Sequence, residues 1–129
     1  MFEMNPLFPD AELIVIERLR AHFPDHIVAD KVPNNVRTAD GVKLITVNHT
    51  GGFDISDVRE SITLTVRIWD YDKDLASDAA RAVEHAMKDR DKVNVLPILT
   101  VRTTMKPQDF TEDSGFMYRA TYTLTVRGT

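Results

Sequence analysis

The stretch "ITLTVRIWDYDKDLASDAARAVEHAM", residues 62–87, decides the fold, because its hydrophobic period changes halfway along it. Its first half alternates apolar residues with threonine and arginine, which predicts a strand from Val58 to Trp69 with one buried face. Asp70 or Asp72 can cap a following helix, since a carboxylate accepts hydrogen bonds from free N–H groups of the first turn. That helix runs to about Lys88 and carries a stripe of small and apolar residues: Ala76, Ala79, Ala80, Val83 and Met87.

The residues before this stretch predict a partner strand. Val42 to His49 is rich in Val, Ile and Thr, the residue types that favour strands. Thr50 to Asp54 contains Gly51 and Gly52, and we expect it to form a flexible connection at the tip of a hairpin. The two strands should therefore pair with each other.

The N-terminal part predicts another helix, from Phe8 to Phe23, with Asp10 and Glu12 in its first turn and Pro24 after its end. Its apolar stripe is broad, which predicts contact with more than one neighbour. The stripe comprises Leu13, Ile14, Val15, Ile16, Leu19 and Phe23. Ile27 to Val32 follows as a short extended piece before turn-forming residues.

The C-terminal part predicts two more strands. Val95 to Met105 contains Pro97 near its start, which favours a sheet edge or a bulge. A polar loop is expected from Lys106 to Gly115, followed by an alternating strand from Phe116 to Arg127. Because the strands come in adjacent pairs, the sequence predicts one α+β domain over residues 1–129. It should hold a mostly antiparallel sheet of about four strands with both helices on one face.

Composition excludes several classes of protein. The 129 residues, of which 43% are hydrophobic, suit a single soluble domain. The chain has no cysteine, which rules out disulfides, thiolate nucleophiles and cysteine-ligated zinc. Its net charge of −4 argues against a nucleic-acid grip built on phosphate neutralisation. No signal peptide or membrane span is recognisable, so we expect synthesis and residence in the cytoplasm.

The search for chemistry yields no catalytic, cofactor or metal site. Asp70, Asp72 and Asp74 alternate like the start of a calcium loop, but Leu75 and Arg81 stand where glycine and a bidentate carboxylate belong. His22 and His26 have ligand spacing on a helix, yet Pro24 between them breaks it. No serine lies in a nucleophile-elbow motif. The chain is therefore not expected to be an enzyme.

Arginines on the polar face of the predicted sheet allow two interpretations. Arg67, Arg119 and Arg127 stand among threonines at positions opposite the apolar ones. They either cover the sheet toward solvent, or they meet another copy of the chain, because arginine is enriched in interfaces. Trp69, with Tyr71 nearby, adds to the interface interpretation because such residues often anchor partners.

Several segments, in this order and spacing, resemble the tail terminator proteins of long-tailed bacteriophages, in particular the short versions in siphovirus-type phages of actinobacteria. The resemblance covers nearly the whole chain. It rests on "MFEMNPLFPDAELIVIERLRAHF" (1–23), "VPNN" (32–35), "HTGGFD" (49–54), the stretch 62–87 quoted above and "YRATYTLTVRG" (118–128).

The resemblance implies an α+β structural protein of the virion. Its copies would form a homohexameric ring that caps the head-proximal end of the tail tube, stops tube growth and presents a surface for head-tail joining. The implied partners are other copies of the chain, the major tail tube protein and the head-tail connector. DNA would only pass through the lumen, without specific binding, and no membrane is involved.

The expected interface residues lie in the longest polar loops and on the polar sheet face. The two loops are His49–Asp57 and Lys106–Gly115, and apolar residues near them would be anchors. The candidates are His49, Gly51, Gly52, Phe53, Asp54, Arg67, Trp69, Met105, Phe110, Phe116, Arg119 and Arg127. An equal alternative is that the apolar side chains near the loops fold back onto their own domain.

Two other functions stay open at this point. A head-tail connector or stopper protein also forms a ring at the same junction, although the two expected helices favour a terminator over an all-β stopper. A small α+β enzyme or ligand-binding domain would need a cleft with converging polar groups. The sequence does not say which loops face the tube and which face the connector.

Overall fold

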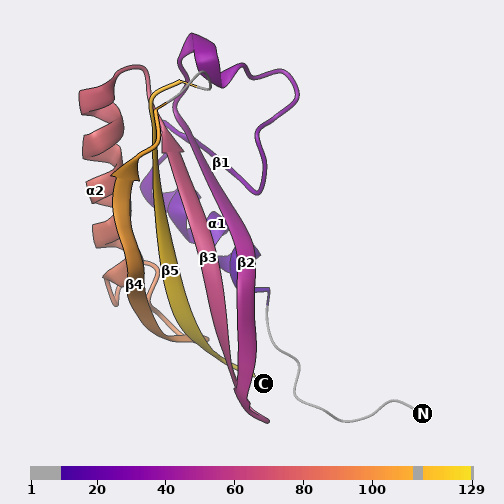
Figure 1. Cartoon of the computed structure of the whole chain (residues 1–129). Helices are drawn as coiled ribbons and strands as arrows, with labels where there is room; N and C mark the ends of the chain where they lie inside the picture. The colour runs from indigo at the N-terminus through magenta and orange to yellow at the C-terminus, as the bar shows by residue number, and fades with distance from the viewer. Residues whose placement is uncertain (1–9, 112–114, 129) are drawn as a thin grey trace.

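The computed structural model describes residues 10–111 and 115–128, and this part of the chain contains two α-helices and five strands (Figure 1). The element order is α1 (Ala11–His22), β1 (Ile27–Ala29), a 3-10 turn η1 (Thr38–Asp40), β2 (Leu44–Ser56), β3 (Arg59–Trp69), α2 (Lys73–Lys88), β4 (Ile98–Asp109) and β5 (Met117–Arg127).

The strands form one sheet in the order β1-β2-β3-β5-β4. Only the β1–β2 pair is parallel, and the other three pairs are antiparallel. Both helices lie against the same face of this sheet (Figure 1). The predicted α+β fold is therefore confirmed. The fifth strand is the short extended piece, which adds to the start of β2 through the pairs Ile27–Leu44 to Ala29–Thr46.

Helix α1 starts where its cap predicts. The Asp10 side chain accepts a hydrogen bond from the Leu13 N–H at 3.1 Å. Val15, Ile16 and Leu19 are buried, but Leu13 is 48% exposed, so the buried stripe is narrower than expected. The difference arises because α1 packs against β1 and β2 and only slightly against α2. The expected start at Phe8 lies outside the described residues.

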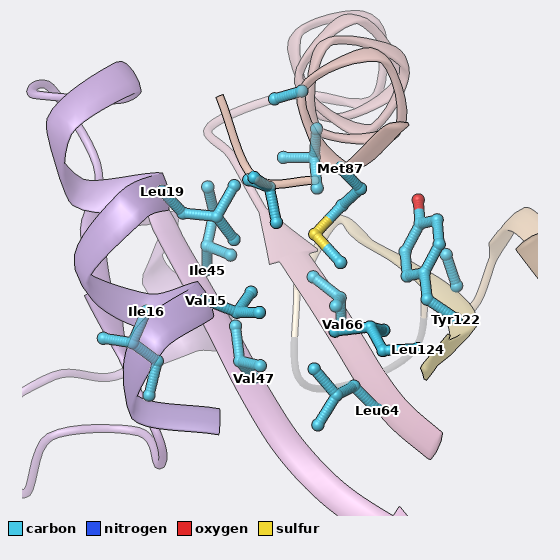
Figure 2. Close-up of a cluster of buried hydrophobic side chains, with 14 of the residues drawn as sticks. Val15, Ile16, Leu19, Ile45, Val47, Leu64, Val66, Met87, Tyr122 and Leu124 are labelled. Carbon is cyan, nitrogen blue, oxygen red and sulfur yellow. The ribbon is translucent and has the colours of Figure 1, made fainter. Parts of the chain in front are cut away.

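Helix α2 is capped by Asp72, whose side chain accepts a hydrogen bond from the Leu75 N–H at 2.8 Å. Every residue of its predicted stripe is buried, and Ala86 joins them. The small side chains allow α2 to lie close to the sheet. Met87 of this helix packs with Val66, Tyr122 and Leu124 of β3 and β5, while Val15 and Leu19 of α1 pack with Ile45 and Val47 of β2 (Figure 2).

Several predicted boundaries are wrong: β1 ends at Ala29 and β4 begins at Ile98, and two segments expected to be loops belong to strands. The expected flexible connection from Thr50 to Asp54 is part of β2, which pairs with β3 as far as Ser56. The extra residue of a bulge is Thr50, between the pairs His49–Leu64 and Gly51–Thr63, and both glycines stay paired with β3. The expected loop from Lys106 still belongs to β4 up to Asp109, because Gln108 and Asp109 pair with Arg119 and Tyr118 of β5.

Strand β4 begins directly after Pro97 and forms one edge of the sheet, as the proline predicted. Strand β5 lies between β3 and β4, and its Tyr122 and Leu124 are fully buried beneath the helices. The sheet face away from the helices, here called the outer face, is rich in threonine. Even there, Thr46, Ser61 and Thr65 are buried between neighbouring side chains.

Candidate interface surfaces

The distal part of the β2–β3 hairpin is the first candidate surface. All residues from His49 to Val58 are exposed, including five of the predicted interface residues: His49, Gly51, Gly52, Phe53 and Asp54. Figure 1 shows this hairpin extending beyond both helices at the far end of the sheet. Its apolar side chains are Phe53 (69% exposed), Ile55 (51%) and Val58 (49%). Exposed apolar side chains gathered at one protruding turn are typical of an interaction surface.

Hydrogen bonds of His49 hold strand β2 in place at the start of the exposed part of the hairpin. The His49 N–H donates a hydrogen bond to the Glu12 carboxylate of α1 at 2.7 Å, and the His49 Nε2 donates to the Gly51 carbonyl at 2.7 Å. Gly52 has a φ of 151°, and a Cβ there would overlap the Ser61 carbonyl oxygen. The strand therefore needs glycine at position 52 to stay paired with β3.

A small hollow of about 180 Å³ lies beside Gly52, and its lining includes the ionisable side chains of His49, Asp54 and Glu60. Burial raises the pKa of the Glu60 carboxyl, and the neighbouring Asp54 raises it further, against the opposing effect of His49. The two carboxylates, Asp54 and Glu60, thus lie close together on the helix side of the hairpin end.

The outer face of the sheet is the second candidate surface, and it unites Arg67 and Arg119 as predicted. These residues stand directly opposite each other on β3 and β5. The Arg67 guanidinium donates a hydrogen bond to the Asn48 side-chain oxygen at 3.2 Å. The Arg119 guanidinium lies 4.0 Å from the ring centroid of Phe110 in a cation–π contact. Each arginine is therefore held in place by a neighbour.

Not all predicted interface residues share these surfaces. Trp69 is only 5% exposed and contributes to the packed end of the sheet, so it is not a free anchor. Met105 and Phe110 are half-buried, Phe116 is 39% exposed, and Arg127 lies at the opposite end of the outer face from Arg119. Among the apolar side chains near the two loops, Met105 and Phe110 are thus partly folded back onto the domain, whereas Phe53 and Phe116 are exposed.

Sequence reasoning missed two arginines of the outer face. Arg59 stands opposite Arg127, and Arg102 of β4 stands opposite Thr123 of β5. Arg59 continues the alternation of β3 by one period and could have been found that way. Arg102 depends on the register of β4, which contains three irregularities and cannot be read from the sequence.

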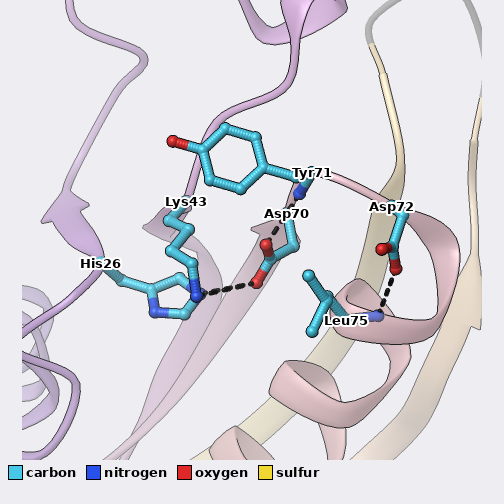
Figure 3. Close-up of polar contacts among 6 residues, drawn as sticks. All are labelled: His26, Lys43, Asp70, Tyr71, Asp72 and Leu75. Atoms are coloured by element: carbon cyan, nitrogen blue, oxygen red, sulfur yellow. Dashed lines mark hydrogen bonds and ion pairs between the residues drawn. The ribbon is translucent and has the colours of Figure 1, made fainter.

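The buried carboxylate Asp70 has a structural role. It is 2% exposed and accepts a hydrogen bond from the Tyr71 N–H at 2.7 Å. The His26 Nε2 lies 3.3 Å and the Lys43 Nζ 3.9 Å from its Oδ2 (Figure 3). These three residues precede β1, precede β2 and follow β3, so the cluster joins three segments at one end of the sheet. Burial lowers the pKa of His26, against the raising effect of Asp70.

Within residues 10–111 and 115–128, no group of three or more His, Cys, Asp or Glu side chains is arranged to hold a metal ion. In the same part of the chain, no helix has the length and apolar character needed to cross a membrane. No protein-family model matches the sequence, and no curated protein matches it either.

Proposed function

We propose that this chain is a structural protein of a long-tailed bacteriophage: a tail terminator whose copies form a ring on the head-proximal end of the tail tube. The observation that carries the proposal is that one sheet has two open edges on opposite sides. A ring needs two different surfaces on each copy, each fitting the other surface on a neighbour. Open strand edges are surfaces that can pair with another chain.

The first open edge belongs to β4. This strand pairs with β5 on one side, and over the described residues no strand pairs with its other side along Ile98–Asp109. The second open edge belongs to β2. It pairs with β1 only from Leu44 to Thr46. From Val47 to Ser56, no strand of the described chain pairs with the edge of β2 that lies away from β3. Both edges are long enough for several hydrogen bonds between neighbouring copies.

The protruding hairpin supplies a third surface. The hairpin end extends beyond both helices (Figure 1) and carries the exposed apolar side chains Phe53, Ile55 and Val58, which can contact a further partner. In a terminator such a partner is the tube end or the connector. A structural role also agrees with the resemblance of nearly the whole sequence to terminator proteins.

Cysteine cross-linking tests the ring directly, because the natural chain has no cysteine. Asp54→Cys places a thiol at the β2 edge, and Lys106→Cys places one at the β4 edge; both positions are exposed. The double variant is treated with a short bismaleimide, in the presence of the tail tube protein of the same phage. We expect a ladder that ends at six copies, about 88 kDa for subunits of 14.7 kDa.

The single variants are the controls. Each carries one thiol, so an edge-to-edge ring cannot produce a ladder from either of them. A double variant that stays monomeric on tube ends would contradict the ring. Efficient dimers from a single variant would also contradict it, because they show a symmetric contact of one edge with itself.

A further inference from the structure

The outer face of the sheet concentrates positive charge in a chain that is negative overall. Five arginines occupy its outward strand positions: Arg59, Arg67, Arg102, Arg119 and Arg127. No Asp or Glu occupies an outward position in the strands, since Asp54, Glu60 and Asp109 alternate to the helix side. Although the chain has a net charge of −4, the outer face of its sheet is therefore basic.

These cations are arranged in pairs that the described chain does not neutralise. Arg67 stands opposite Arg119, and Arg59 opposite Arg127, on the adjacent strands β3 and β5. Like charges directly opposite each other destabilise a sheet. Among residues 10–111 and 115–128, none of the five arginines forms an ion pair. An anionic partner would remove this repulsion.

Between the arginines the face presents hydroxyl groups, and its apolar side chains on these strands, Trp69, Met105 and Met117, are buried or half-buried. Its outward positions on β3, β5 and β4 are mostly threonine: Thr63, Thr65, Thr100, Thr121, Thr123 and Thr125. The core of a protein interface is apolar and, apart from arginine, depleted of charge, whereas the exposed part of this face consists mainly of arginine and threonine. Arginine and threonine side chains are instead common donors to the phosphates of nucleic acids.

The spacing of the pairs suits a phosphate backbone. Arg67 follows Arg59 by eight positions along β3, which corresponds to roughly 26 Å along the strand. One strand of a DNA duplex places about eight phosphates along that length. Contacts to phosphates carry no sequence information directly, so sequence-specific reading is not expected.

We propose that the outer face binds the phosphate backbone of duplex DNA without sequence preference. This inference goes beyond the ring, since it concerns a property of each isolated subunit and does not depend on assembly. Total charge alone predicts that DNA does not bind, whereas the separation of charge between the two faces allows one face to bind it.

Fluorescence anisotropy of the purified chain with a labelled 20-base-pair duplex tests the proposal. Four phosphate contacts predict that binding weakens about 100-fold between 50 mM and 200 mM NaCl. In the Arg67→Gln/Arg119→Gln variant, the loss of two contacts should reduce this salt effect to about 10-fold and weaken binding at 50 mM. The Arg59→Gln/Arg127→Gln variant should show the same weaker binding and smaller salt effect. Because both of its arginines are exposed, these substitutions should leave the fold intact.

The matched control is Arg81→Gln/Arg90→Gln, which removes the same charge from exposed positions in α2 and the loop after it. It should bind DNA as the natural chain does. Absence of salt-dependent binding at 50 mM NaCl, or equal losses in all three variants, would overturn the proposal. Displacement of the DNA by an equal charge of polyglutamate would overturn it in favour of an acidic protein surface. Cross-linking tests the ring separately, so failure of either proposal is distinguishable from failure of the other.

Discussion

His26 shows how a single residue ties the sheet together and makes stability depend on pH. Its side chain is 9% exposed beside Asp70 and Lys43, at the end of the sheet where three segments meet. Burial disfavours the imidazolium, so the folded protein holds the pKa of His26 below the ordinary value of 6.5. The unfolded chain then binds more protons than the folded chain over the range between the two values.

The free energy of unfolding should therefore fall as the pH drops from 7 toward 5, because the group's contribution is complete above its unfolded pKa and is lost below it. Urea denaturation at several pH values measures this. The His26→Asn variant should show a flatter profile than the natural chain. His22→Asn, at an exposed position outside the cluster, should keep the natural slope. Identical profiles for all three chains would contradict this assignment.

At the scale of elements, Gly52 decides whether β2 stays paired with β3 in the hairpin. Gly51 and Gly52 are neighbours with different constraints. Gly52 has a φ of 151° and lies against the Ser61 backbone, whereas a Cβ at Gly51 would find its nearest atom at 3.9 Å, the Cβ of Thr63. The two positions thus provide a matched pair for testing the need for glycine at position 52.

Gly52→Ala should destabilise the protein by about 1–3 kcal/mol, because alanine must leave this backbone conformation or displace β3. Gly51→Ala should change stability by less than about 1 kcal/mol. Urea denaturation of both variants measures the difference. Equal losses at the two positions would show that the backbone at Gly52 is not constrained as described.

The sequence predicted the elements better than their ends. Hydrophobic period identified both helices and the hairpin strands, because a buried stripe leaves a clear pattern in α2 and β3. The glycines at 51 and 52 indicated a turn, yet pairing with β3 kept them in the strand. Polar residues from Lys106 to Asp109 likewise indicated a loop, although an edge strand can be polar on its open side.

For the candidate surfaces, too, the sequence predicted part of the arrangement and missed the rest. Arg67 and Arg119 were predicted on one face because alternation defines a face without knowledge of strand order. Their direct opposition required the β3–β5 pairing, which joins strands that are not consecutive in the chain. Trp69 was misjudged as an anchor because its position at the strand end does not reveal that this end of the sheet is covered.

At the scale of the whole molecule, the contacts that we propose fall on separate surfaces. The proposed ring uses the two open edges of the sheet, the hairpin adds an exposed apolar end, and the outer face carries positive charge. The helices cover the opposite face and complete the core. This division is what a ring-forming virion subunit requires, since each copy must contact its neighbours and a further partner at the same time.

Deletion of the gene from the phage or prophage that carries it, followed by electron microscopy of the lysate, tests the terminator function most directly. The account predicts overlong tail tubes without heads, beside heads filled with DNA, because tube growth is no longer stopped. Supplying the natural gene in trans should restore normal tails. Tails of normal length that fail to join heads would contradict the length-control claim and assign the protein to the connector side of the junction.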